Sequence, residues 1–124
     1  MSEAASRRRA FRYGLSGESA AAWFLRLKGY RILARRYKTP AGEADIVARR
    51  GTCLVFVEVK ARAAVSTALE AITPRQQRRV AAAARSWISR HPGDAALTLR
   101  FDAIFVAPSR WPLHIANAFE IDIG

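Results

Sequence analysis

The sequence predicts an α/β fold, α+β by some counting, in which helices flank a mixed sheet and the elements follow the order αβββαββ. Three observations predict it. Two segments carry apolar residues at helical spacing behind helix-capping residues. Five short segments rich in β-branched residues surround the second of these helices. One of the five is apolar on both faces, which is typical of a central strand that is covered twice.

The first helix is expected to begin at about Ser16, a capping residue, and to end at Gly29. Its predicted buried stripe has the spacing i, i+3, i+4 and i+7 and consists of Ala20, Trp23, Phe24 and Leu27. Such a stripe would place the helix against one face of the sheet.

Three strands are expected next, at residues 30–37, 43–50 and 53–60. Pro40 and Gly42 mark the first turn, and Gly51 marks a tight second connection. Because both connections are short, the three strands are predicted to form an antiparallel meander.

The second helix is expected to begin behind Thr73, with Pro74 in its first turn and Gln76 at capping-box spacing. Its predicted buried stripe consists of Val80, Ala84, Trp87 and Ile88. The residues "HPG" at 91–93 end it, and two further strands are expected within residues 97–107 and 112–119.

The composition indicates an anionic partner. Lys and Arg number 21 against 10 Asp and Glu, a net charge of +11, and nucleic acid is the common partner of such chains. An acidic membrane surface or an acidic protein is the alternative.

No apolar run is long enough to span a membrane, so a soluble, cytoplasmic protein is expected. Residues 1–13 are predicted to be a flexible basic arm, and residues 14–124 a single domain.

Charged side chains gather at one end of the predicted sheet. Glu58 and Lys60 are two residues apart on a strand and therefore share a face, as do Glu43 and Asp45. Antiparallel pairing of these strands would bring Asp45 beside Glu58 and Lys60. Carboxylate oxygens are the ligands that Mg²⁺ prefers, so the pattern predicts a site for Mg²⁺ or Mn²⁺. The alternative is an ordinary ion pair at the exposed end of a strand.

These residues resemble a known motif. Asp45 followed by "Glu58-Val59-Lys60" at the end of the next strand is similar to the PD-(D/E)xK nuclease superfamily. The segments "GEADIV", "LVFVEVKAR", "RFDAIFVA" and "HIANAF" resemble the uncharacterised bacterial YraN-like family, over nearly the whole chain after residue 13. The resemblance implies a restriction-endonuclease-like fold and a kinship with Holliday-junction resolvases.

The resemblance also implies roles for individual residues. Asp45 and Glu58 would bind the metal with the backbone carbonyl of Val59, and Lys60 would stand next to the attacking water. Glu18 on the first helix and Gln77 on the second would join the catalytic residues, and Glu43 would support them. For Glu18 there is a simpler alternative, because the helix dipole alone favours an acid in a first turn.

Basic residues flank these positions in the sequence, and each exposed one can neutralise a phosphate. The candidates for nucleic-acid binding are Arg35, Arg36, Lys38, Arg62, Arg75, Arg78 and Arg79. Arg49 and Arg50 belong to the same basic set. No module that recognises base sequence is visible, which favours recognition of nucleic-acid shape.

The sequence therefore predicts a nuclease that uses Mg²⁺ or Mn²⁺ and acts on nucleic acid, DNA in preference to RNA. By analogy with the resolvase-like branch, its substrate would be structured or branched and it would act as a homodimer. The alternative is a non-catalytic DNA- or RNA-binding module of a repair or recombination assembly that keeps the nuclease fold.

Overall fold

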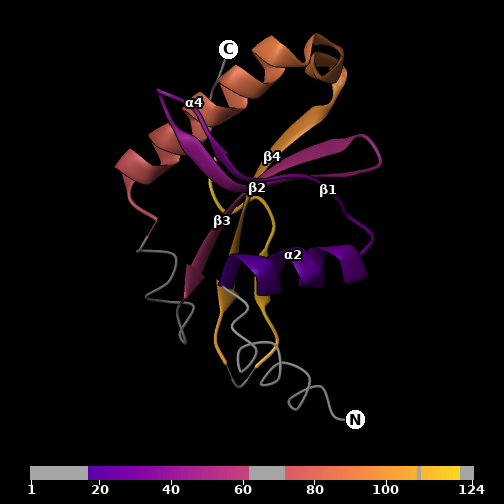
Figure 1. The fold of residues 1–124 in the computed structure, drawn as a ribbon, viewed down its shortest axis with the longest axis vertical. Coiled ribbons are helices and arrows are strands. Elements are labelled where there is room, and N and C mark those ends of the chain that lie inside the picture. The colour runs from indigo at the N-terminus through magenta and orange to yellow at the C-terminus, as the bar shows by residue number, and fades with distance from the viewer. Residues whose placement is uncertain (1–16, 62–71, 109, 121–124) are drawn as a thin grey trace.

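The structure is a computed structural model, and it describes residues 17–61, 72–108 and 110–120 (Figure 1). Its elements, in chain order, are α2 (Gly17–Leu27), β1 (Arg31–Lys38), β2 (Glu43–Arg50), β3 (Cys53–Ala61), α4 (Pro74–Arg90), the 3-10 helix η1 (Pro92–Ala96), β4 (Thr98–Val106) and β5 (Leu113–Ile115). The predicted basic arm, the predicted cap Ser16 and the candidate Arg62 lie outside the described residues.

The five strands form one mixed sheet in the order β1-β2-β3-β4-β5. Only the β3 and β4 pair is parallel, and the other three neighbouring pairs are antiparallel. The predicted fold class and element order are thus confirmed. The last strand is much shorter than residues 112–119, because regular pairing ends at Ile115 and Asn117 just beyond it takes a left-handed backbone conformation (φ 54°).

The two helices cover opposite faces of the sheet, as Figure 1 shows. Helix α4 packs Val80, Ala84 and Trp87 against a cluster that includes Phe56 and Phe101. Ile88 of the predicted stripe packs against the edge of this cluster. Helix α2 covers the other face. Neither helix has the length and apolarity to cross a membrane, within the part of the chain that the structure describes.

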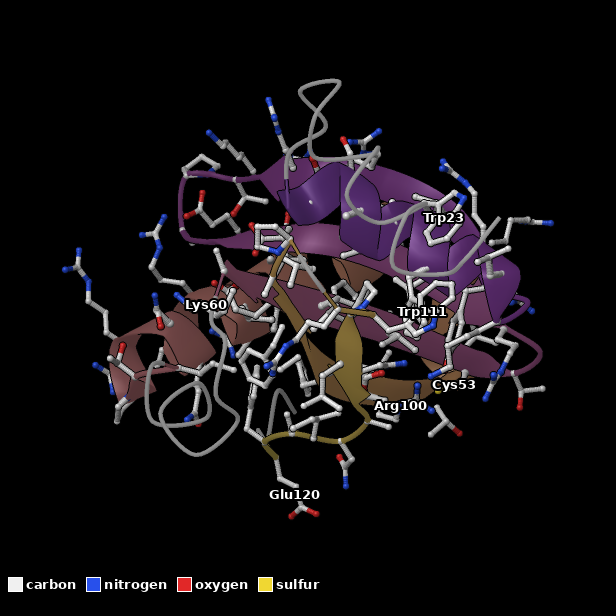
Figure 2. All side chains as sticks on the ribbon, turned by 90° about the horizontal axis from the view of Figure 1, so that it is seen from below. Trp23, Cys53, Lys60, Arg100, Trp111 and Glu120 are labelled. Carbon is white, nitrogen blue, oxygen red and sulfur yellow. The ribbon has the colours of Figure 1, made fainter. Side chains whose placement is uncertain are left out.

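The buried face of α2 is not the predicted one. Trp23 and Leu27 are 40% and 60% exposed. The residues that face the sheet are Ala20, Ala21, Ala22 and Leu25. Small alanine side chains let the helix pack closely onto the strands, and Trp23 instead stacks on Trp111 with ring centroids 5.6 Å apart (Figure 2). Periodicity alone could not separate these two overlapping faces.

Helix α4 begins with the predicted capping box. The Thr73 hydroxyl accepts a hydrogen bond from the Gln76 amide, and the Gln76 side chain accepts one from the Thr73 amide. Its first two turns lie against the β1–β2 turn. There the backbone carbonyl of Arg79 comes so near that a Cβ on Gly42 would lie 2.0 Å from its oxygen. Gly42 therefore permits the contact between the helix and the hairpin.

We expect Gly42→Ala to lower the free energy of unfolding by about 2 kcal/mol or more, because the added methyl meets backbone that cannot rotate away. Urea unfolding measures the change. The matched control is Gly93→Ala, since a Cβ on Gly93 meets no atom within 4 Å. Equal stability of the two variants would contradict the close approach of α4.

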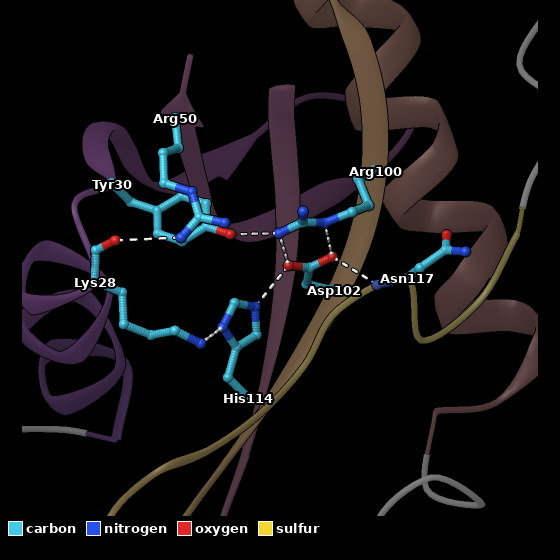
Figure 3. A network of polar contacts seen from close by, with 7 residues as sticks. All are labelled: Lys28, Tyr30, Arg50, Arg100, Asp102, His114 and Asn117. Atoms are coloured by element: carbon cyan, nitrogen blue, oxygen red, sulfur yellow. Dashed lines mark hydrogen bonds and ion pairs between the residues drawn. The ribbon is translucent and has the colours of Figure 1, made fainter. Parts of the chain in front are cut away.

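A buried carboxylate joins α2, β4 and β5 (Figure 3). Asp102 is fully buried and accepts two hydrogen bonds from Arg100, one from His114 Nε2 at 2.6 Å and one from the Asn117 amide at 2.9 Å. Lys28 Nζ lies 2.7 Å from His114 Nδ1 and can only donate a hydrogen bond to it. Because Nδ1 accepts, the imidazole proton is on Nε2, which donates to Asp102. Burial raises the pKa of Asp102, but the hydrogen bonds from His114 and Arg100 lower it overall. The Arg100–Asp102 ion pair is thus part of a larger network.

We expect Asp102→Asn to destabilise the protein by about 3 kcal/mol, because Arg100 and His114 would lose their buried anion. Chemical denaturation at neutral pH is the measurement, with the exposed Glu120→Gln as control. A loss below about 0.5 kcal/mol, the range of an ordinary surface substitution, would contradict this role.

Candidate functional site

The register of β2 and β3 brings Asp45 to the end of β3. Ile46 pairs with Val57, and one step further along the hairpin the Val59 amide donates a 2.7 Å hydrogen bond to Asp45 Oδ2. This bond anchors the carboxylate beside Glu58. The predicted approach of Asp45 to the Glu58 and Lys60 segment is therefore present in the structure.

Glu58 and Lys60 form a sheltered pair. Lys60 Nζ lies 3.6 Å from Glu58 Oε1, and their side chains are only 16% and 14% exposed. An ordinary exposed pair at a strand end, the simpler alternative, does not describe this burial. Residues 54–57 of the same strand are buried among apolar side chains, so the charged end of β3 emerges where the core ends.

The electrostatics of the site are dominated by carboxylates. Burial, as the largest cause, and the negative charge of Asp45 together raise the pKa of Glu58 to about 7, against the opposing effect of Lys60. Burial also raises the pKa of Asp45, against the Val59 hydrogen bond that lowers it. Glu43 raises the pKa of both carboxylates. Negative charge thus exceeds what Lys60 neutralises, and a divalent cation would relieve this repulsion.

Glu18 faces the sheet because it lies on the side of α2 whose alanines pack against the strands. The acid lies three, four and seven residues before Ala21, Ala22 and Leu25, which are all buried. Its negative charge contributes to the raised pKa of Asp45. Glu18 therefore lies within electrostatic reach of the site, as the resemblance implies.

Two consecutive arginines hold Glu18. Arg35 donates to both of its carboxylate oxygens, at 2.7 and 3.0 Å, and Arg36 Nε lies 3.4 Å away. Neighbouring strand residues normally point to opposite faces. Arg36 escapes this rule because its backbone is left-handed, with φ 51°. The hydrogen bond from Arg35 lowers the pKa of Glu18 despite its burial.

A cavity of about 260 Å³ opens beside Asp45. Its lining consists of Arg36, Lys38, Glu43, Ala44 and Asp45. Glu43 is half exposed and its carboxylate lies 3.8 Å from Arg79 on α4. A group that enters this cavity meets two carboxylates, of Glu43 and the anchored Asp45, and two cations, which suits a phosphate accompanied by a metal ion.

The remaining predicted residues lie on the first turns of α4. Gln77 donates its side-chain amide to the Ile72 carbonyl at 3.2 Å, and its approach to the carboxylates stays a prediction. Arg75 and Arg78 are exposed. Their contact with nucleic acid also stays a prediction.

The donor set of the site fits one hard cation. Among the described residues, no three His, Cys, Asp or Glu side chains are grouped to hold a metal by themselves. Mg²⁺ needs fewer, because it keeps several waters and binds through one or two carboxylates and a substrate phosphate. Asp45, Glu58 and the carbonyl of Val59 would supply such a set.

Fold and site together define a class of protein, namely a basic α/β protein with a sheltered pair of carboxylates and a lysine at the end of a central strand. Residues 17–106 match the family model described as "Uncharacterised protein family UPF0102". The chain belongs to the UPF0102 family, which confirms the YraN-like resemblance.

Relatives match over almost the whole chain. A UPF0102 protein of Methylocella silvestris is 53% identical over 124 residues, the full length of both chains. UPF0102 proteins of Bradyrhizobium diazoefficiens and Rhodopseudomonas palustris are 56% and 57% identical over 111 residues, which is 90% of this chain and 84% and 85% of theirs. The names of these relatives state no activity.

The raised pKa of Glu58 predicts a pH-dependent loss of stability in the absence of divalent metal. A carboxyl whose pKa rises from 4.5 to about 7 on folding stabilises the protein below pH 4.5, and that stability is lost as the pH rises through 7. We therefore expect Glu58→Gln to be more stable than the wild type by about 2 kcal/mol at pH 8 and equally stable near pH 4.5.

Urea unfolding in EDTA at these two pH values measures the difference. A Glu58→Gln variant that is destabilised by the same amount at both would contradict the repulsion between Asp45 and Glu58. Glu120→Gln serves as control, because Glu120 is exposed and projects well away from Lys60 (Figure 2).

Proposed function

We propose that the protein is a nuclease that uses Mg²⁺ or Mn²⁺ to hydrolyse phosphodiester bonds of nucleic acid. The observation that carries the proposal is the pair of sheltered carboxylates, Asp45 and Glu58, beside Lys60 in a strongly basic chain. A protein that only binds nucleic acid gains nothing from two carboxylates where phosphates approach, because the charges repel. A cation between them reverses this effect.

The proposed roles are those that the resemblance implies, and the observed contacts support them. Asp45 and Glu58 would hold the metal with the Val59 carbonyl, and the Val59 amide keeps the Asp45 carboxylate in place. When bound, the ion lowers the pKa of the attacking water and stabilises the charge on the phosphate. Lys60, held near Glu58, would orient the nucleophile and stabilise the negative charge that develops on the phosphate oxygens.

The resemblance of Asp45 and Glu58-Val59-Lys60 to the PD-(D/E)xK superfamily supports this chemistry. The net charge of +11 and the cations Arg36 and Lys38 beside Asp45 support a nucleic-acid substrate. DNA is proposed in preference to RNA, and a structured or branched form rests on analogy with resolvases. The small footprint of one such chain on a duplex is consistent with a homodimer.

A second candidate function is a non-catalytic module that binds DNA or RNA. The observation that favours it is the tight hold of Arg35 and Arg36 on Glu18, which withdraws this acid from metal binding. Lys60 likewise neutralises part of Glu58. In this alternative the ion pairs are structural, and the basic surface alone serves binding.

Cleavage of an end-labelled panel separates the two functions. The panel comprises duplex, single strand, flap, four-way junction and structured RNA, each with Mg²⁺, Mn²⁺ or EDTA. We expect metal-dependent cleavage that falls at least about a hundred-fold in Glu58→Ala and in Lys60→Ala, because each removes a group that acts on the transition state. Glu120→Ala, which removes an exposed carboxylate far from the site, should retain full activity.

Binding without cleavage under every metal condition, unchanged in the Glu58 and Lys60 variants, would refute the nuclease and support the binding module. The preferred member of the panel would identify the class of substrate.

A further inference from the structure

A second cavity, of about 410 Å³, lies at the opposite end of β2 from Asp45. Its lining, here called the arginine pocket, consists of Gly29, Arg31, Arg49, Arg50 and Gly51. We propose that the arginine pocket binds a backbone phosphate of the nucleic acid, several nucleotides from the bond that the carboxylate site cleaves. The proposal rests on the proposed function for its substrate but on separate residues for its evidence.

The pocket concentrates positive charge that no carboxylate of the described residues neutralises. Arg31 and Arg49 are direct partners across the antiparallel β1–β2 pair, an arrangement in which like charges destabilise a sheet. Arg50 is the next residue. Within the described residues none of these three guanidinium groups forms an ion pair with a carboxylate. An anion in the pocket would remove the repulsion.

Two of the arginines are held in place before any ligand arrives. Arg49 Nε donates to the Gly51 carbonyl at 2.9 Å, and Arg50 donates to the Lys28 carbonyl at 3.2 Å. The Arg50 guanidinium also lies 4.4 Å over the ring of buried Tyr30, as Figure 3 shows. Each guanidinium has five N–H donors, so most donors remain for a ligand. Preorganised arginines are well suited to bind phosphate oxygens in pairs.

The backbone leaves room for the ligand. Gly29 and Gly51 both have positive φ, 90° and 60°, which favours glycine at each turn. A Cβ on Gly51 would meet no atom within 4 Å, so the space beside this turn is open. The phosphate therefore has access to the pocket next to main chain that carries no side chain.

Edge strand β1 connects the two cavities. Arg31 lines the arginine pocket and Arg36 lines the cavity beside Asp45, and both are exposed, as are Arg35 and Lys38. Five residues of strand cover roughly 17 Å, the axial length of about five phosphates on one strand of duplex DNA. Basic residues on an edge strand also prevent that strand from pairing with a strand of another chain. That purpose explains charge along β1 but not the convergence of three arginines on one pocket.

The test is the salt dependence of DNA binding in EDTA, where no cleavage occurs. The variant is Arg31→Gln with Arg49→Gln, and the control is Arg85→Gln with Arg90→Gln, which removes equal charge from exposed positions on α4. For a 12-base-pair duplex, the slope of log K against log salt should weaken by about 0.9 in the pocket variant, since the pocket neutralises one phosphate and each phosphate contact contributes about 0.9. The control should keep the wild-type slope.

Equal slopes in the two double variants would overturn the proposal. A second arm titrates inorganic phosphate into the wild type by NMR. Saturable binding of free phosphate at the pocket, with an unchanged slope for DNA in the variant, would overturn the assignment to the nucleic-acid backbone.

The outcome is independent of catalysis. Asp45→Asn should abolish cleavage in Mg²⁺ without weakening the salt dependence of binding if both proposals hold. If the wild type cleaves nucleic acid but the pocket variant keeps the wild-type salt slope, only the proposal for the pocket is refuted. If the pocket variant has a weaker salt slope but the wild type does not cleave, only the proposed nuclease activity is refuted.

Discussion

The antiparallel register of β2 against β3 is the constraint on which the candidate site depends. With Ile46 opposite Val57, the Asp45 carboxylate reaches the Val59 amide, and Glu58 and Lys60 follow at the end of the same strand. The tight connection between the strands fixes this register, because Arg50 pairs with Cys53 and Gly51 between them has a positive φ of 60°. The turn at Gly51 therefore determines where the charges meet.

The same constraint concentrates negative charge at a cost in stability. Two carboxylates with raised pKa values share one lysine, in a chain whose net charge is strongly positive. Elsewhere the molecule neutralises its buried charge thoroughly, since Asp102 has Arg100, His114 and the Asn117 amide as partners. The contrast between this satisfied network and the incompletely neutralised carboxylates supports the proposed cation site at Asp45 and Glu58.

Local signals predicted most of the fold, and long-range packing decided the rest. The turns, the apolar strand and the Thr73 capping box each depend on residues close in sequence. The buried face of α2 depends instead on how near alanines let the helix approach the sheet. Networks across distant elements were beyond prediction, because Lys28 and His114 are 86 residues apart. The sequence contained a signal for the arginine pocket in Arg49 and Arg50, but Arg31 joins them only through the register of β1.

The measurement that tests the central claim most directly is Mn²⁺ binding to the protein alone, followed by electron paramagnetic resonance. If Asp45 and Glu58 form a cation site, the wild type binds Mn²⁺, Mg²⁺ displaces it, and Asp45→Asn and Glu58→Gln each weaken binding at least about ten-fold, as expected on loss of a metal ligand. The control Glu120→Gln keeps the wild-type affinity. Equal Mn²⁺ binding by the wild type and both site variants would contradict the account.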